Sequence, residues 1–447
     1  MTPVIYLCNI ARSGALFGGS QDLLRYLNKV MKAAGEEQQL QRDIMINVNK
    51  FVGLAAVAAM LAATPALAAD VKIGILGDLT GPIEALAGPI VKGAQQAFDD
   101  VNAQGGILDG KIVSVTGDSA CDPSVAGPAA DKLVNTDQVT AIMGAFCTGA
   151  TIGAATAAGI PGGVVMISPS ATAPALTTLD DNDLVFRTAP SDAFQGVKLA
   201  DLLIQKGVKS VALTYVNNDY GKGLADVFKA QYAKDGGTVT ADVSHEDGKA
   251  DYRAELGQLA AGGTQDLVII AYASGSGHTI LQQAVESGDF NTYIGVDGMI
   301  GDDLLKGIDP AAVNGKLFAT RAGSYTGDGA AAFDKAEASL KNDKGQYDTY
   351  VPQAYDAAFL LALAIEKNGN AGREGLSQAL RDVATAPGEK ILPGEWAKAL
   401  ADIKAGKDID YDGAGGPAEF DAAGDVDGII VEVDVTDGKF VEVGAVK

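Results

Sequence analysis

The feature that most constrains the fold of this 447-residue chain is a regular alternation of strand and helix patterns that begins at Val71. The β-branched runs Val71–Leu76 and Lys111–Gly117 are separated by the amphipathic stretch Val91–Val101, and the alternation continues to Ile167. Strands that are joined by helices pair in parallel, because each connection has to cross over the sheet. The pattern therefore predicts an α/β fold in which helices cover both faces of a parallel sheet.

The alternation stops at residues 188–191 and then restarts, which predicts a second α/β unit. The second series begins with helix Ala193–Lys206 and continues to about residue 319. Several helical stretches follow between residues 331 and 405, and they are too many for the second unit alone. We therefore expect the chain to cross back over the first unit, and its tail to form a hairpin around Asp437.

Length and composition limit the class of protein. A chain of 447 residues is longer than one core usually needs, which favours at least two domains. A hydrophobic content of 47% with only 6% aromatic residues is typical of a helix-covered α/β protein. The formal net charge of -23, with no cluster of lysine and arginine, repels phosphate backbones and anionic lipids. We therefore expect no nucleic-acid partner.

The N-terminal region contains one long apolar run, Phe51–Ala63, which follows Lys50 and precedes the small-residue sequence Thr-Pro-Ala-Leu-Ala. A short apolar run with these flanks is typical of a secretory signal peptide, and we predict one over residues 45–68, cleaved after Ala68. The run is shorter than the ~20 apolar residues of a membrane span. We therefore expect the mature chain not to span a membrane.

Residues 1–44 precede this segment, and no signal peptide requires them. We interpret them as a non-native or mis-assigned extension, with Met45 as the true start. The alternative interpretation is that Asp22–Gln41 forms an amphipathic helix with a role of its own.

Export makes the cysteine content informative. Cys8 lies in the region that would be discarded, so Cys121 and Cys147 are the only pair in the mature chain. In an oxidising compartment such a pair usually bonds, and closing this loop would stabilise the fold by about 3 kcal/mol. We therefore expect neither a catalytic nor a metal-binding thiol.

Most motifs of enzymatic and metal chemistry are missing from the sequence. His245 and His278 lack the spacing of a zinc site and are interpreted as surface histidines, and there is no nucleophile elbow. The run Gly105–Lys111 resembles a phosphate loop, but it precedes a strand instead of a helix and is interpreted as a turn. We therefore expect no cofactor and no enzyme activity.

One metal motif does fit its pattern. Residues 408–413, with an acid six residues after the glycine, match a calcium-binding EF-hand loop that places carboxylates at the ligating positions. Pro417 late in the loop and a turn over Phe420–Gly424, where a helix belongs, argue against calcium. The candidate ligands, disfavoured on these grounds, are Asp408, Asp410, Asp412 and Glu419.

Five short motifs carry a resemblance to a known family. They are GILGDLTGP at Gly74–Pro82, DSACDP at Asp118–Pro123, GAFCT at Gly144–Thr148, ISPSATAPAL at Ile167–Leu176 and DYGKGL at Asp219–Leu224. In these motifs and in their spacing, the chain from about Val71 onward resembles the leucine/isoleucine/valine-binding family. This family comprises the type I periplasmic solute-binding proteins of branched-chain amino-acid ABC importers.

The resemblance implies two Rossmann-like lobes that are joined by three hinge crossovers and close on a ligand between them. Lobe 1 would comprise residues 69–189 and about 322–418, and lobe 2 would comprise residues 190–321 and about 419–447. The resemblance also implies a disulfide in the first lobe, which here would be Cys121–Cys147.

The resemblance further assigns roles to single residues, so that both ends of an amino-acid zwitterion are bound. Hydroxyl and amide groups of the first lobe would bind the α-carboxylate, namely Thr148, Ser170, Ala171 and Thr172. A carboxylate of the second lobe, Asp297, would pair with the α-ammonium. The remaining assignments are Tyr220 and Tyr272 as aromatic walls, and Leu86 and Tyr350 in the side-chain pocket.

Each assignment has an ordinary structural alternative: Asp297 as a turn residue, Thr148 as a helix cap, and the tyrosines as core residues. Taken together, they favour a monomeric, non-enzymatic receptor in the periplasm. It would capture a branched-chain or other apolar amino acid by lobe closure and deliver it to the transmembrane permease of an ABC importer. The alternative is a ligand-sensing module that binds a small amide or carboxylated solute.

Overall fold

The computed structural model describes residues 69–447 and single positions between Gln21 and Met45. The chain divides into two compact units, Met1–Leu67 and Ala68–Lys447. In the first unit the described positions are helical and exposed. Most of the predicted signal peptide, its cleavage site and Cys8 lie outside the described residues.

The first sheet of the second unit has five parallel strands in the order β2-β1-β3-β4-β5. The strands are β1 (Val71–Gly77), β2 (Ile112–Asp118), β3 (Ala141–Gly144), β4 (Val165–Ser168) and β5 (Val185–Arg187). The connecting helices are α3 (Glu84–Ala103), α4 (Pro123–Asp131) and α5 (Thr148–Ala154), with π-helical turns at Lys132–Thr136 and Ala155–Gly159. The strand order reverses at β1, so the carboxyl ends of β1 and β3 flank a crevice of the kind where open α/β sheets bind ligands.

The second sheet has seven strands in the order β14-β13-β10-β9-β8-β6-β7. Its parallel strands are β6 (Ser210–Val216), β7 (Thr238–His245), β8 (Asp266–Ile270), β9 (Thr292–Gly295) and β10 (Leu317–Gly323). The predicted C-terminal hairpin is confirmed, because β13 (Ile429–Thr436) and β14 (Lys439–Ala445) pair antiparallel and extend this sheet from β10. The helices of this lobe are α6 (Asp192–Gln205), α7 (Asp219–Lys234), α8 (Arg253–Ala260), α9 (Ser276–Ser287) and α10 (Pro310–Val313), with 3-10 turns at Asp297–Met299 and Asp302–Leu305.

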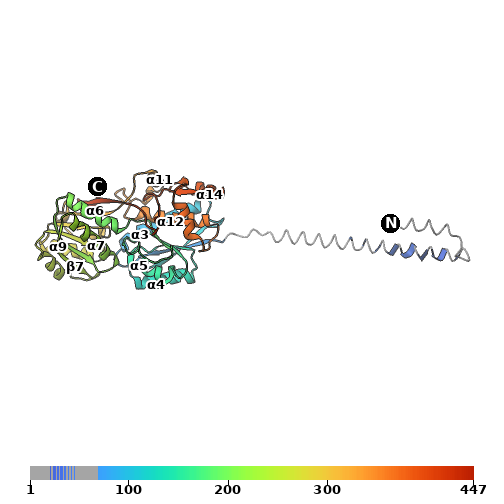
Figure 1. The fold of residues 1–447 in the computed structure, drawn as a ribbon, viewed down its shortest axis with the longest axis horizontal. Coiled ribbons are helices and arrows are strands. Elements are labelled where there is room, and N and C mark those ends of the chain that lie inside the picture. The colour runs from blue at the N-terminus through green and yellow to red at the C-terminus, as the bar shows by residue number, and fades with distance from the viewer. Residues whose placement is uncertain are drawn as a thin grey trace. The chain divides into compact units, whose positions relative to one another are not determined.

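After β10 the chain returns to the first lobe, as the sequence predicts. Helix α12 (Val351–Asn368) packs against α3, β3 and β4, and almost all of its side chains are buried. A helix that is apolar on every face belongs in the interior. Figure 1 shows the orange helix α12 beside the blue helix α3. The other elements of this segment are α11 (Asp328–Ala336), the 3-10 turn Ala338–Leu340, α13 (Leu376–Ala384), β11 (Glu389–Ile391), α14 (Trp396–Lys404) and β12 (Ile409–Tyr411).

Two local predictions have clear outcomes. The run Gly105–Lys111 is a turn, as predicted: Ile107 pairs with Gly110, and Leu108 and Asp109 between them have φ angles of 49° and 62°. The interpretation of His245 as a surface histidine is wrong. His245 is the last residue of β7 and is buried. Its ring forms hydrogen bonds with the hydroxyls of Thr214 (2.7 Å) and Ser276 (3.0 Å). Among the described helices, none is both long and apolar enough to cross a membrane.

Candidate ligand-binding site

A small cavity lies between the two lobes, at the carboxyl ends of both sheets. Its free volume is about 30 Å³, and most of its walls are apolar or aromatic. Seven of the nine residues that the sequence assigns to a ligand site line this cavity, namely Leu86, Thr148, Ser170, Tyr220, Tyr272, Asp297 and Tyr350. The other lining residues are Ile83, Ile90, Phe146, Cys147 and Gly298.

Asp297 is the polar centre of the second-lobe wall. It follows strand β9 and is 4% exposed. Its Oδ1 accepts hydrogen bonds from the Tyr220 hydroxyl (2.8 Å) and from Gln195 Nε2 (3.0 Å). Its Oδ2 accepts one from the Tyr350 hydroxyl (2.8 Å). Burial raises the pKa of Asp297, and these three donors oppose that shift by stabilising the carboxylate. The site therefore presents a desolvated, oriented acceptor for a cationic or N–H group.

The tyrosines around Asp297 are fixed by their own contacts. The rings of Tyr220 and Tyr272 stack with centroids 5.4 Å apart, and the Tyr272 hydroxyl accepts a hydrogen bond from Asn218 (3.0 Å). Asn218 also caps helix α7 by accepting from the Gly221 amide (3.0 Å), so the helix start positions Tyr220. Burial raises the pKa of all three cavity tyrosines. They therefore keep their hydroxyl protons, and Tyr220 and Tyr350 donate theirs to Asp297.

Tyr350 reaches Asp297 from a strained backbone position. It precedes α12 with a φ of 68°, in the left-handed region that a tyrosine rarely adopts. A residue in this region costs on the order of 1–3 kcal/mol, so the surrounding packing has to hold it there. The hydrogen bond to Asp297 is one of the contacts that do so.

The first-lobe wall carries hydroxyl groups. Thr148 is the first residue of α5, and its Oγ1 accepts a hydrogen bond from the Ala173 amide (3.3 Å). The Ser170 hydroxyl donates to the Phe146 carbonyl (3.0 Å). Among the described residues that line this cavity there is no lysine or arginine. The first-lobe wall can therefore bind an anionic group through hydroxyls and amides, without a salt bridge.

Two of the predicted site residues do not line the cavity. Ala171 is fully buried, and its amide donates to Ser168 Oγ (3.0 Å). Thr172 donates its hydroxyl to Asp192 Oδ2 (2.9 Å). Ser170 therefore lines the cavity, whereas the Thr172 hydroxyl points to the carboxyl group of Asp192 in the first turn of α6.

The disulfide Cys121–Cys147 is present, as the sequence predicts. Sequence reasoning missed its neighbour Asp78, which follows β1 and is fully buried. Asp78 accepts hydrogen bonds from the amides of Cys121 (2.7 Å), Phe146 (2.9 Å) and Cys147 (2.8 Å). It thereby ties both ends of the disulfide to the loop that carries Thr148. The available signal was an acid placed directly after an apolar strand.

Sequence reasoning also missed the acid and the amide in the first turn of α6. Asp192 and Gln195 are 0% and 1% exposed, and Asp192 Oδ1 and Gln195 Oε1 are without a donor among the described residues. Burial raises the pKa of Asp192 well above its ordinary value, and the charge of Asp297 raises it further. The carboxyl group of Asp297 accepts hydrogen bonds from three donors and that of Asp192 from one. Because donors stabilise a carboxylate, we assign the negative charge to Asp297 and a proton to Asp192.

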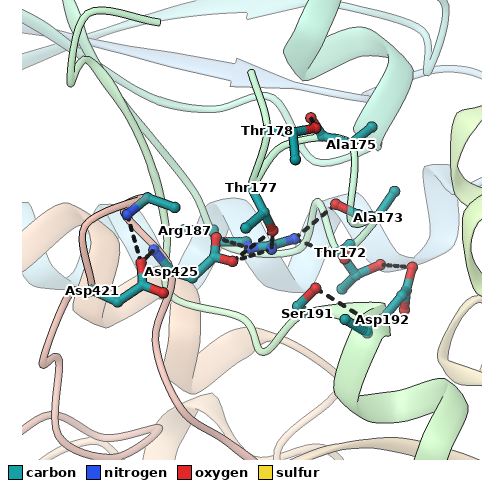
Figure 2. A network of polar contacts seen from close by, with 12 residues as sticks. Thr172, Ala173, Ala175, Thr177, Thr178, Arg187, Ser191, Asp192, Asp421 and Asp425 are labelled. Carbon is teal, nitrogen blue, oxygen red and sulfur yellow. Dashed lines mark hydrogen bonds and ion pairs between the residues drawn. The ribbon is translucent and has the colours of Figure 1, made fainter. Parts of the chain in front are cut away.

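A buried arginine holds the neighbouring segment in place (Figure 2). Arg187 on β5 is paired with Asp425 (2.6 Å) and donates to the carbonyls of Thr172 (2.7 Å) and Ala173 (3.0 Å). Its guanidinium therefore links the stretch after β12 to the strand-end segment that borders the cavity. Arg187 forms its ion pair with Asp425, and its charge lowers the pKa of Asp192 against the larger effect of burial.

The candidate calcium ligands are engaged by different partners. Asp408 pairs with Lys367 (3.1 Å) and Asp412 with Lys390 (2.8 Å). Asp410 lies on strand β12, and Glu419 accepts from the Ala386 amide (3.2 Å). The segment thus begins as a strand where the EF-hand pattern requires a loop. Within the described residues, the group that could in principle hold a metal is Asp78 with Cys121 and Cys147, and the disulfide already occupies both sulfurs.

The fold and the cavity define a class of protein. Two α/β lobes enclose a small site that has hydroxyls on one wall and a buried carboxylate on the other, as in proteins that bind a small solute by closing their lobes. A family model described as periplasmic binding protein matches residues 70–409. The chain belongs to this family.

Similar proteins of known name cover most of the chain. The Leu/Ile/Val-binding protein BraC3 of Rhizobium johnstonii is 33% identical over 352 residues, which are 76% of this chain and 92% of that protein. The leucine-, isoleucine-, valine-, threonine-, and alanine-binding protein of Pseudomonas aeruginosa is 31% identical over 323 residues, covering 71% of this chain and 84% of that protein. Both relatives are named for the amino acids that they bind.

Solved structures agree on the fold. The substrate-binding protein LivJ of Streptococcus pneumoniae, solved with isoleucine, superposes with a TM-score of 0.68 at 25% identity and covers 84% of this chain and 100% of that one. The leucine-binding protein LivK of Thermotoga maritima superposes with a TM-score of 0.70 at 23% identity and covers 84% and 99%.

Proposed function

We propose that this protein is a periplasmic amino-acid receptor of an ABC importer. The observation that carries the proposal is Asp297, a buried carboxylate held by three donors, opposite a wall of hydroxyls. An α-amino acid has the complementary ends. Its ammonium would donate to Asp297. Its carboxylate would accept from the Thr148 hydroxyl, and from the Ser170 hydroxyl once that hydroxyl turns away from the Phe146 carbonyl. Each charge-assisted bond would contribute about 1.5–3 kcal/mol.

The walls between the two polar ends support an aliphatic side chain. The apolar side chains that line the cavity are Ile83, Leu86, Ile90 and Phe146. Each CH₂ group of a ligand that they bury contributes about 0.8 kcal/mol to the binding free energy. The side chains of branched-chain amino acids are wholly aliphatic and can make such contacts. The relatives named for leucine, isoleucine and valine support the same ligand class.

Lobe closure supports delivery to a permease. Thr148 belongs to lobe 1, whereas Asp297 and Tyr220 belong to lobe 2. All three are nearly fully buried, so the site is complete only when the lobes meet. We propose lobe 1 as residues 69–189 and about 322–418, and lobe 2 as the rest. The closed form would dock on the transmembrane permease as a monomer, after export through a signal peptide over residues 45–68. The receptor would bind its ligand without chemical change.

The experiment is calorimetry with leucine on the purified chain and on Asp297→Ala. Leaving an ammonium without its buried partner costs about 3–5 kcal/mol, which is a loss of affinity of about 150-fold or more. Asp289→Ala, at an exposed acid of the same lobe that lines neither this cavity nor the neighbouring one that shares Leu86 with it, is the matched control and should keep its affinity. Unchanged affinity for leucine in Asp297→Ala would refute the assignment of the ammonium site.

A further inference from the structure

The chain passes between the two lobes three times. Crossover 1, residues 188–191, joins β5 to α6; crossover 2, residues 324–327, joins β10 to α11; and crossover 3, residues 412–428, joins β12 to β13. These three stretches together are the hinge on which lobe closure has to turn, because no other stretch of residues 69–447 connects the lobes. All three are linked by contacts to the first two turns of helix α12.

Crossover 1 is bonded to the backbone of α12. The Thr188 hydroxyl, on a residue that is 8% exposed, donates to the Gln353 carbonyl (2.8 Å). The side chain of Gln353 donates through Nε2 to the carbonyl of Gly323 (3.5 Å), the last residue before crossover 2. One residue of α12 therefore contacts both connections.

Crossover 3 bends around the carboxyl group of Asp356, which follows Gln353 by three residues. Asp356 is 3% exposed, and its Oδ1 accepts from the Tyr411 hydroxyl (2.8 Å) and the Ala414 amide (2.7 Å). Its Oδ2 accepts from the Gly415 amide (2.7 Å). A Cβ atom at position 413 would lie 2.6 Å from this Oδ2, so the carboxylate explains the glycine that the EF-hand pattern shares.

Crossovers 2 and 3 also contact each other. The Tyr325 amide donates to the Gly415 carbonyl (3.3 Å), and a Cβ atom at Gly416 would overlap the Tyr325 ring. Gly415 is therefore held by Asp356 through its amide and by crossover 2 through its carbonyl.

The same end of α12 reaches the ligand site. Tyr350 directly precedes the first turn, and its hydroxyl donates to Asp297 of the other lobe (2.8 Å). Gln353 and Asp356 are one turn apart and lie on one side of the helix. We propose that Gln353 and Asp356 are positioning residues, which fix the hinge relative to Tyr350 so that the two walls of the site meet in one arrangement. The proposal rests on the lobe closure proposed above and adds residues that do not line the ligand cavity.

A looser hinge should weaken binding without any change in the ligand contacts. A site that is held near its bound arrangement loses less conformational freedom when it binds. Changes at residues that modulate such coupling without touching a ligand alter affinity by about threefold to thirtyfold.

Two variants test the proposal. Asp356→Asn replaces one carboxylate oxygen by an NH₂ group, which cannot accept from the backbone amides of crossover 3. Thr188→Val removes the hydroxyl that bonds crossover 1 to α12.

Each variant has a matched control at the other end of α12. Glu366→Gln changes a buried acid of the same helix that accepts from the Leu108 amide (2.7 Å). Thr140→Val removes a buried hydroxyl that donates to the Ala371 carbonyl (2.9 Å). Both controls perturb lobe 1 in the same chemical way but leave the hinge contacts intact.

The first measurement is the distance between spin labels by pulsed electron paramagnetic resonance, without ligand. The labels are placed at the exposed positions Ala233→Cys on α7 and Ala401→Cys on α14, one in each lobe. The distance distribution should broaden in Asp356→Asn and Thr188→Val and stay as in the parent in both controls. Calorimetry should then show leucine binding weakened by about threefold to thirtyfold in the first two variants and within about twofold of the parent in the controls.

The outcomes separate this proposal from the receptor function. Distributions that stay narrow in both hinge variants, or that broaden equally in the controls, would show that α12 does not position the hinge. Leucine affinity at the parent level in hinge variants with broadened distributions would show that the hinge contacts do not serve binding. If the parent itself does not bind leucine, the receptor function fails, and the label distances still decide the role of α12. Thr188→Val changes a single hydroxyl and decides the test even if Asp356→Asn does not fold.

Discussion

Replacing Asp192 with asparagine should stabilise the ligand-free protein at neutral pH. Asp192 is fully buried, one of its oxygens lacks a donor among the described residues, and the other accepts only from Thr172. The charge of the buried Arg187 lowers the pKa of Asp192 only in part, because burial outweighs it and Arg187 is paired with Asp425. Asparagine keeps the acceptor for Thr172 and places N–H donors at the carboxyl oxygen that has no partner among the described residues, one helical turn from Oε1 of Gln195.

The size of the effect follows from proton linkage. The folded-state pKa of Asp192 is raised, because burial and the charge of Asp297 disfavour its ionised form. A carboxyl group of this kind contributes most to stability below its unfolded pKa, and that contribution is lost as the pH rises towards its folded pKa. The loss amounts to about 1.4 kcal/mol per pH unit, and the neutral asparagine does not suffer it.

The assay is thermal and urea unfolding of the unmodified chain and of Asp192→Asn between pH 4 and pH 8, without ligand. The stability of the variant relative to the parent should increase as the pH rises. Asp425→Asn is the contrasting variant, because it removes the carboxylate that Arg187 pairs with and should destabilise the fold by about 3–5 kcal/mol. A variant Asp192→Asn that is less stable than the parent at pH 7, or a difference that does not change with pH, would show that Asp192 is ionised.

Three other predictions concern the disulfide and the site. Replacing Cys121 and Cys147 with alanine opens a loop with a sequence separation of 26 and should cost about 3.5 kcal/mol, measured by urea unfolding; equal stability would contradict this. Tyr350→Phe should weaken leucine binding about tenfold through loss of the bond to Asp297, whereas Tyr272→Phe, which loses only the bond from Asn218, should change it less. Because burial raises the pKa of Asp297, leucine affinity should fall as acid protonates it; an affinity that stays level from pH 8 to pH 4 would oppose an ionised Asp297.

The alternation of strands and helices was sufficient to predict the two α/β lobes and the return of the chain after β10. Short elements escaped prediction. The three-residue strands β5 and β11 are too short to show a period of two, and they exist because neighbouring strands pair with them. His245 was misplaced for a related reason: its burial depends on Ser276, which packs against it from another helix.

The residues of the candidate site divide in the same way. Asp297, Thr148 and Tyr220 were assigned through the resemblance to the leucine/isoleucine/valine-binding family, whose motifs place each of them after a strand or at a helix start. The hydrogen bonds from Gln195 and Tyr350 to Asp297 join residues 102 and 53 positions apart. No local pattern encodes contacts of this kind.

The sequence by itself determined the order of secondary structure, the cysteine pair and the chemical types available at the strand ends, because these depend on neighbours along the chain. Only the tertiary structure decided which carboxyl group keeps its charge and that the Thr172 hydroxyl faces Asp192. These properties depend on burial and on distances between elements that meet only when both lobes are packed.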